Sequence, residues 1–244
     1  MFQDYFRSIS SDKLRQPGLT RQVRGRPWTW RKSGGSGKRK SIQPSSAESN
    51  AASLRFRLSC LRKRFGVKEI DPTWPFYGVF EFAPTPQRPF WLYVTSGHSN
   101  PWHEESDGHD PASQSGAGIE FIFASAERGD WATQCLQNLL AFDLLLDVGH
   151  FPGGQPLTEG DRIPIRSPIN GKENCLIRNV ILSRPASLPT GFQLPSGQVD
   201  LLTFTGITDS ELAFAKENGT EALIDRLQPL GFFPVTDPHR RSIT

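Results

Sequence analysis

Hydrophobic and polar residues alternate along several short segments of the chain, which is the pattern of half-buried β-strands. The clearest segments are residues 77–82 (YGVFEF), 90–95 (FWLYVT) and 119–123 (IEFIF). In the last of them, the alternation places Phe121 toward a core and Glu120 away from it. Shorter strands are expected near residues 162–165, 180–182 and 199–204.

Residues 51–65 (AASLRFRLSCLRKRF) follow a helical period instead. Apolar side chains recur along one face, at Leu54, Leu58, Leu61 and Phe65. This spacing predicts an amphipathic helix that docks on the sheet. Because its arginines lie off the apolar stripe, a helix that lies on a membrane surface or binds nucleic acid stays an alternative.

The longest helical pattern runs over residues 130–147 (DWATQCLQNLLAFDLLLD), and Asp130 is a candidate N-cap. A second helix start is marked by Thr208 and Glu211, which have the spacing of a capping box. Asn218-Gly219 then predicts a break in that helix. Strands with helices before, within and after them define an α+β fold, a mixed β-sheet packed with helices.

Composition is consistent with this fold and limits its size. A chain of 244 residues holds one large domain or two small ones. The hydrophobic fraction of 36%, with 17 Phe and 6 Trp, supplies a core built on aromatic side chains. The 20 Pro and 22 Gly predict many turns between short elements.

Charge divides the chain into two parts. Residues 1–70 carry 17 Lys+Arg and 4 Asp+Glu, a net charge of +13, whereas residues 71–244 carry 11 and 21, a net charge of −10. Residues 1–50 are also rich in Gly and Ser and poor in aliphatic side chains, so we predict a disordered basic arm ahead of a folded domain at residues 51–244. Such an arm meets polyanions or folds back on its own acidic body.

The sequence favours a cytoplasmic protein. No apolar run approaches the roughly 18 residues that span a bilayer, and the N-terminus lacks the apolar region of a secretory signal. The Arg- and Ser-rich composition of the arm also fits an organelle transit peptide. The cysteines, Cys60, Cys135 and Cys175, form no CxxC pair, which favours a reducing compartment.

Candidate catalytic and metal-binding residues gather in the polar loop between residues 97 and 118. His98, His103 and His109 share this loop with several carboxylates, which are suitable zinc ligands. Their spacing matches no compact metal motif, and no nucleophile elbow or phosphate-binding loop is present. We therefore predict no metal, no cofactor and no catalytic site.

The basic arm contains one candidate DNA-binding motif. Arg24, Gly25, Arg26 and Pro27 resemble the core of an AT-hook. Two arginines on an extended, glycine-hinged chain fit the narrow and electronegative minor groove of A·T tracts. Flanking lysines and arginines would add phosphate contacts.

Taken in order, several motifs resemble the suppressor of fused family. They are PFWLYVTSG, the Ser-Gly-rich SGAGIEFIF, the helix DWATQCLQNLLAFDLLLD, VDLLTFTGIT and the helix start TDSEL. The resemblance extends from about Ser53 to the C-terminus. It implies a single suppressor-of-fused-like lobe, the amino-terminal one of the two-lobed animal proteins, and a partner-binding role without catalysis.

The resemblance also implies where a partner binds. Trp102 stands about where the family has an aromatic residue that touches a partner peptide, so we take Trp102, with His98 and His103 of the same loop, as candidate partner contacts. The family's acidic contact is not clearly retained. Bacterial relatives look like immunity proteins of polymorphic toxin systems, so the expected partner is a toxin domain or an extended peptide segment. The alternative is a nucleic-acid-associated protein that acts through residues 1–50.

Overall fold

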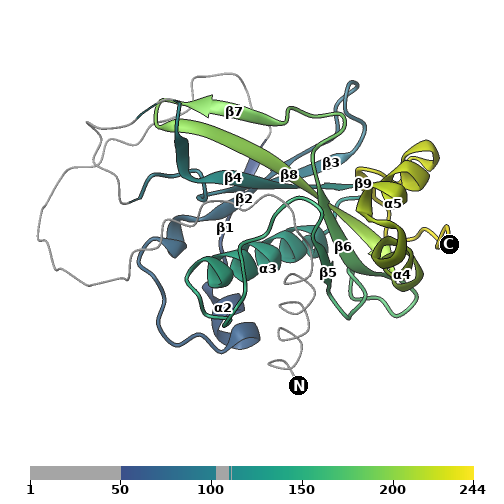
Figure 1. Ribbon diagram of the computed structural model, residues 1–244, viewed down its shortest axis with the longest axis horizontal. Coiled ribbons are helices and arrows are strands. Elements are labelled where there is room, and N and C mark those ends of the chain that lie inside the picture. The colour runs from purple at the N-terminus through teal and green to yellow at the C-terminus, as the bar shows by residue number, and fades with distance from the viewer. Residues whose placement is uncertain (1–50, 103–109, 111) are drawn as a thin grey trace, which may run out of the picture.

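The computed structural model describes residues 51–102, 110 and 112–244, which form one mixed β-sheet flanked by helices (Figure 1). The strands are β1 (Ala51–Arg55), β2 (Gly78–Phe82), β3 (Trp91–Ser96), β4 (Gln114–Ser125), β5 (Arg162–Pro164), β6 (Ile177–Ser183), β7 (Gly191–Leu194), β8 (Gly197–Thr208) and β9 (Val235–Thr236). The helices are α2 (Leu58–Phe65), α3 (Asp130–Asp147), α4 (Asp209–Asn218) and α5 (Thr220–Leu227), with 3₁₀ turns η1 (Trp74–Phe76) and η3 (Gln228–Leu230). The predicted α+β class is confirmed.

The strand order in the sheet is β1-β2-β3-β4-β8-β6-β5, with β7 paired to β8 and β9 paired to β4. The two longest strands, β4 and β8, lie at the centre and run parallel, whereas β1 to β4 form an antiparallel meander. The predicted strands at residues 77–82, 90–95 and 119–123 correspond to β2, β3 and β4. The structure extends β4 back to Gln114, into the Ser-Gly-rich segment.

The main core lies between the sheet and α3. Phe121 and Phe123 of β4 face Leu202 and Phe204 of β8 across the parallel pair, and all four side chains are buried. Helix α3 contributes Leu136 and other apolar residues to the same cluster. Figure 1 shows α3 below the sheet, with α2 beside it.

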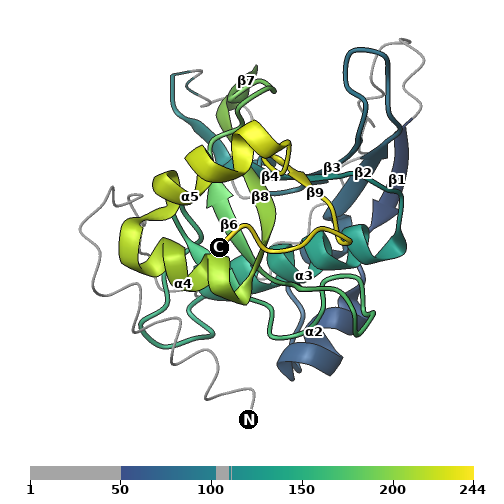
Figure 2. The ribbon, with the colours of Figure 1, turned by 90° about the vertical axis from the view of Figure 1, so that its right-hand side faces the viewer.

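The opposite face of the sheet is covered at one end by α4 and α5. Ile181 of β6 belongs to their cluster, whereas its neighbours Val180 and Leu182 belong to the α3 core, as strand alternation requires. Figure 2 shows α4 and α5 to the left of α3 and above α2. The sheet is therefore buried on both faces near β6 and β8.

The predicted helix over residues 51–65 is wrong in its first half. Residues 51–55 form β1, which pairs antiparallel with β2, and the helix begins only at Leu58. Leu54 is 36% exposed, while Phe56 and Leu61 are buried. Strand β2 offers unpaired backbone groups along this edge, so pairing with them outweighs the local helical period.

The helix ends are mostly as predicted. Helix α3 has the predicted bounds, but its N-cap is Gly129 rather than Asp130, whose side chain makes no capping bond. Asp130 instead places its negative charge in the first turn, where the helix dipole favours it. The capping box is confirmed, because Thr208 Oγ1 accepts from Glu211 N–H and Glu211 Oε2 accepts from Thr208 N–H. Gly219 separates α4 from α5.

Candidate functional site

Glu120 of β4 organises the loop that follows β3. Its carboxylate accepts hydrogen bonds from Thr95 Oγ1 (2.6 Å), Gly97 N–H (2.9 Å), Ser99 N–H (2.9 Å) and Ser99 Oγ (2.7 Å). Glu120 is only 2% exposed. The alternation of β4 does turn it away from Phe121, but the prediction that this places it outside the core is wrong, because the loop covers it. Glu120 is an interior group that holds residues 97–99 against β4.

The Ser-Gly-rich start of β4 allows this close approach. Gly116 has a φ of +56°, and a Cβ at this position would lie 2.5 Å from Asn100 O and 2.7 Å from His98 O. Ala117 N–H donates to His98 O (2.6 Å), and Ser115 Oγ donates to the carbonyl of the neighbouring Ser99 (2.6 Å). Side chains larger than hydrogen at residue 116 would push the loop away.

His98 lies beneath the loop, not on its surface. The residue is 3% exposed, and its Nε2 is 3.0 Å from Asp143 Oδ2 of α3, although the two atoms are not oriented for a hydrogen bond. The ring edge contacts Tyr77 and Phe121, with centroids 5.5 Å apart in each case. His98 therefore anchors the loop to α3 and to the core.

Trp102 ends the described part of the loop and forms an aromatic stack. Its ring stacks on Tyr77, at 6.0 Å between centroids, and packs against Phe76 of η1 at 5.8 Å. Its Nε1–H donates to Gly97 O (3.0 Å). Trp102 is half-buried, while Phe76 is 55% exposed. We call Phe76 and Trp102 together the aromatic patch.

The aromatic patch rests on Tyr77, whose hydroxyl stays uncharged at neutral pH. Burial raises the pKa of the Tyr77 hydroxyl well above its ordinary value, against the lowering effect of its hydrogen bond with Trp102. The negative charge of Glu120 raises it further. Tyr77 is therefore an uncharged support for Trp102 and is not a base.

The remaining candidate residues lie outside the described residues. They are His103, His109, Arg24, Gly25, Arg26 and Pro27. Within residues 51–102, 110 and 112–244, no three His, Cys, Asp or Glu residues are grouped to hold a metal ion. No helix in this part of the chain is long and apolar enough to cross a membrane.

Sequence reasoning missed two residues of this site. Phe76 lies in a turn-forming stretch, TWPFYG, and only the structure brings it beside Trp102. Asp143 lies in the leucine-rich helix and is fully buried, with its carboxylate accepting from Leu157 N–H. Its position three residues after Leu140, on the apolar face, is a signal that would have marked it as a buried acid.

The fold and the site define an α+β domain in which a buried carboxylate secures a surface loop ending in an aromatic patch. The family model described as Suppressor of fused protein (SUFU) matches residues 73–241, well over half of the chain. The chain therefore belongs to the suppressor of fused family, as its motifs indicate. The sequence matches none of the curated proteins.

Several solved structures share the fold. The structure of the Sufu–Fu complex matches with a TM-score of 0.57 and 21% identity, over 79% of this chain and 84% of that one. A SUFU homologue from Neisseria gonorrhoeae FA 1090 matches at 0.52 and 18%, over 81% and 89%. Drosophila Suppressor of Fused matches at 0.52 and 21%, over 68% of this chain and 42% of that one. The chain thus spans less than half of the Drosophila protein.

Proposed function

We propose that this chain is a non-catalytic protein-binding domain that captures a partner through the aromatic patch and the loop beyond it. The observation that carries this proposal is the way the patch is held. Three hydrogen bonds from Gly97 and Ser99 to Glu120 fix the loop, and Trp102 at its end packs against the exposed ring of Phe76. Rigid aromatic side chains at a surface are the usual anchors of protein interfaces.

The wider context supports a protein partner. One structural neighbour is the Sufu protein in its complex with Fu. The net charge of −10 over residues 71–244 favours a basic partner surface, since complementary charge speeds association. A bacterial immunity protein that neutralises a nuclease toxin would meet such a surface, and this is the specific role we propose.

The proposal is tested by pull-down from the native host with matched variants. Phe76→Ala removes the exposed ring and should weaken capture by about 2 kcal/mol, roughly thirtyfold in affinity. Trp102→Phe keeps the stack but loses the indole hydrogen bond, so it should bind better than Trp102→Ala. Leu230→Ala in η3 is the control, because Leu230 is as exposed as Phe76 (55%) but lies beside α5, on the opposite face of the sheet from α2 and α3.

Two results separate the general role from the specific one. A partner that the Phe76→Ala protein loses and the Leu230→Ala protein retains supports the aromatic patch. If that partner also stops growth when expressed alone and the present chain restores growth, the immunity role is supported. Equal capture by all variants would place the binding surface elsewhere.

A second candidate function is binding to a polyanion through the basic N-terminal part. Exposed cations continue after the arm through β1 and α2 and the residues next to them, at Arg55, Arg57, Arg62, Lys63 and Lys68. None of these has an ion-pair partner within the described residues. Clustered cations of this kind bind phosphate backbones through counterion release.

Titration of the full chain with duplex DNA at increasing salt tests this candidate. A chain that begins at Ala51 separates the arm from the cations on α2, and replacing Arg26 by Ala tests the AT-hook-like motif. Binding that does not fall as salt rises would exclude an electrostatic mode. Preference for A·T tracts that is lost in Arg26→Ala would favour this function over the first.

A further inference from the structure

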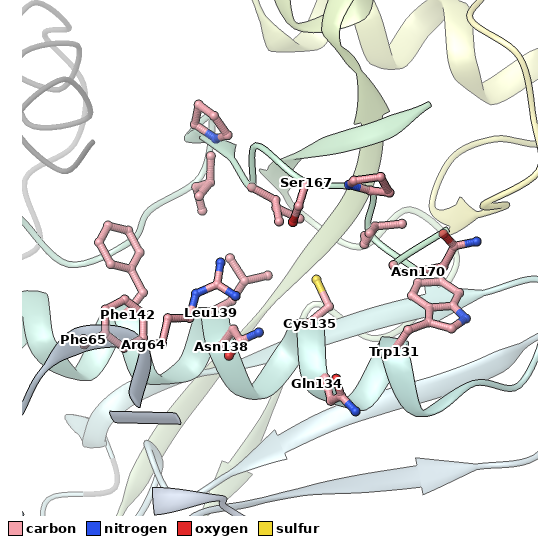
Figure 3. Close-up of a pocket in the computed structure, with 16 residues that line it drawn as sticks. Arg64, Phe65, Trp131, Gln134, Cys135, Asn138, Leu139, Phe142, Ser167 and Asn170 are labelled. Carbon is pink, nitrogen blue, oxygen red and sulfur yellow. The ribbon is translucent and has the colours of Figure 1, made fainter. Parts of the chain in front are cut away.

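A pocket of about 240 Å³ lies on the side of α3 that faces the loop after β5 (Figure 3). Its floor comes from α3, one wall from the end of α2, and the other wall from β5 and the turn that follows. The lining residues are Arg64, Phe65, Trp131, Gln134, Cys135, Asn138, Leu139, Phe142, Ile163, Pro164, Ile165, Ser167, Pro168, Ile169, Asn170 and Gly171. The pocket shares no residue with the aromatic patch.

Much of the pocket is apolar and aromatic. Phe65 and Phe142 stand at one end in Figure 3, with Leu139 beside them. Cys135 points its sulfur into the space from the floor. Burial raises the pKa of the Cys135 thiol to about 12, so it is a protonated, weakly polar part of the floor at neutral pH and is not a nucleophile.

The only formal charge among the described lining residues is positive. Arg64 is half-buried at the end of α2, and Figure 3 shows its guanidinium reaching over the floor of the pocket between Phe142 and Cys135. Its charge also acts on Cys135, where it lowers the thiol pKa against the larger effect of burial. No carboxylate of the described residues forms an ion pair with Arg64.

Two residues at the other end of the pocket have buried donors without acceptors, although Figure 3 shows both nitrogens on the side turned away from Cys135. Trp131 Nε1–H and Asn170 Nδ2 are enclosed and have no hydrogen-bond partner in the described part of the chain. Buried donors of this kind are normally paired. The other polar side chains of the lining, those of Gln134, Asn138, Ser167 and Asn170, are neutral, so the formal charge of the pocket is that of Arg64 and is complementary to a negatively charged ligand.

From this arrangement, we propose that the pocket binds a carboxylate carried on a compact apolar body, with Arg64 pairing the carboxylate and the aromatic end enclosing the body. Guanidinium groups bind carboxylates in a two-point fork, and the pairing is strongest where water is partly excluded. The volume is below the range of about 300–1,000 Å³ that is usual for drug-sized ligands, so the ligand is the size of one aromatic acid or of one terminal residue of a peptide.

The test is an NMR titration of the full chain with 3-phenylpropionate, read at the indole N–H signal of Trp131. The neutral amide of the same compound is the matched ligand. We expect the carboxylate to shift the signal saturably and the amide to bind at least about tenfold more weakly, because it cannot pair with the guanidinium. Equal binding of the two compounds, or no shift with either, would overturn the proposal.

Two arginines on α2 provide the matched protein control. Arg64→Gln should weaken 3-phenylpropionate by about tenfold and leave the amide unchanged, whereas Arg62→Gln, at an exposed arginine that does not line the pocket, should change neither. Equal losses in the two variants would show only a general attraction to the basic helix and would overturn the site. Because the acid and amide are compared on the unmodified chain, the proposal stays testable if Arg64→Gln fails to fold.

The source of the carboxylate is decided by a second pair of probes. N-acetyl-glycyl-phenylalanine and its C-terminal amide present the same chemistry at the end of a peptide. If this peptide acid binds more tightly than 3-phenylpropionate, the ligand is the chain terminus of a partner protein. If it binds more weakly, while 3-phenylpropionate retains its preference over the amide, the ligand is a free small acid.

Discussion

Two buried glutamates hold two surface segments in this domain, and they do so with different partners. Glu211 pairs with Arg240 in a two-point ion pair, Nη1 to Oε1 at 2.5 Å and Nη2 to Oε2 at 2.6 Å, and also accepts from the N–H groups of Thr208 and Ile243. Glu120 is equally buried, but its four hydrogen bonds come from hydroxyl and backbone N–H groups. No cation pairs with Glu120 among the described residues.

The two glutamates differ in role. One stabilises the fold, and the other holds a loop at the surface. The Glu211–Arg240 pair fixes the C-terminal segment to α4 and to β8, where Arg240 also donates to Gly206 O. A buried charge pair is costly to break from either side. Glu120 instead relies on neutral donors, and three of its four hydrogen bonds come from Gly97 and Ser99 of one short loop, so its hold depends on that loop keeping its conformation. We infer that the Glu211–Arg240 ion pair stabilises the fold and that the hydrogen bonds to Glu120 position the aromatic patch.

The largest predicted effect follows from breaking the Glu211–Arg240 ion pair. Arg240→Ala leaves Glu211 buried without its cation and should lower the free energy of unfolding by about 3–5 kcal/mol. Chemical denaturation measures the loss. Arg241→Ala, at the exposed neighbour, is the control and should change stability by less than about 0.5 kcal/mol. A loss below about 1 kcal/mol for Arg240→Ala would show that the ion pair contributes little to the stability of the fold.

A smaller loss of stability is expected from weakening the hydrogen bonds to Glu120. Glu120→Gln keeps the size of the side chain but turns an NH₂ group toward hydrogen-bond donors, so the free energy of unfolding should fall by about 1–3 kcal/mol. The same denaturation experiment applies, with the exposed Glu217→Gln as control. Equal stability of Glu120→Gln and the unmodified chain would mean that these hydrogen bonds contribute nothing net.

The smallest effect is expected at the N-terminus. Glu120, Glu211 and their partners all lie within residues 51–244, and residues 1–50 carry few aliphatic side chains to bury. We predict that a chain beginning at Ala51 melts within about 5 °C of the full chain. Thermal unfolding of the two proteins measures this. A larger drop would show that the arm packs on the folded domain.

Much of the fold could be predicted because local and tertiary preferences agree. The alternation over β2, β3 and β4, the leucine face of α3 and the capping box at Thr208 each point to the structure that forms. Residues 51–55 could not be assigned in this way. Their helical period is real, but the open edge of β2, which is 23 residues or more further along the chain, decides the outcome.

The site was less predictable because its contacts are distant in sequence. Trp102 and His98 were found through the family resemblance, but the structure shows His98 buried and Phe76 beside Trp102. Glu120 was read as an outward residue because alternation assigns a side chain to one face of a sheet and says nothing about what covers that face. Only the three-dimensional structure shows that the loop folds back over the strand and covers Glu120.

The central claim is that Glu120 holds the loop that presents the aromatic patch, and amide hydrogen exchange at Gly97 and Ser99 tests it most directly. In the unmodified chain these two N–H groups, which donate to Glu120 Oε1, should be protected. In Glu120→Gln their exchange should accelerate by at least about tenfold, while the amides of Phe123 and Phe204 in the central strands keep their protection. Unchanged exchange at Gly97 and Ser99, or equal acceleration throughout the sheet, would contradict the claim.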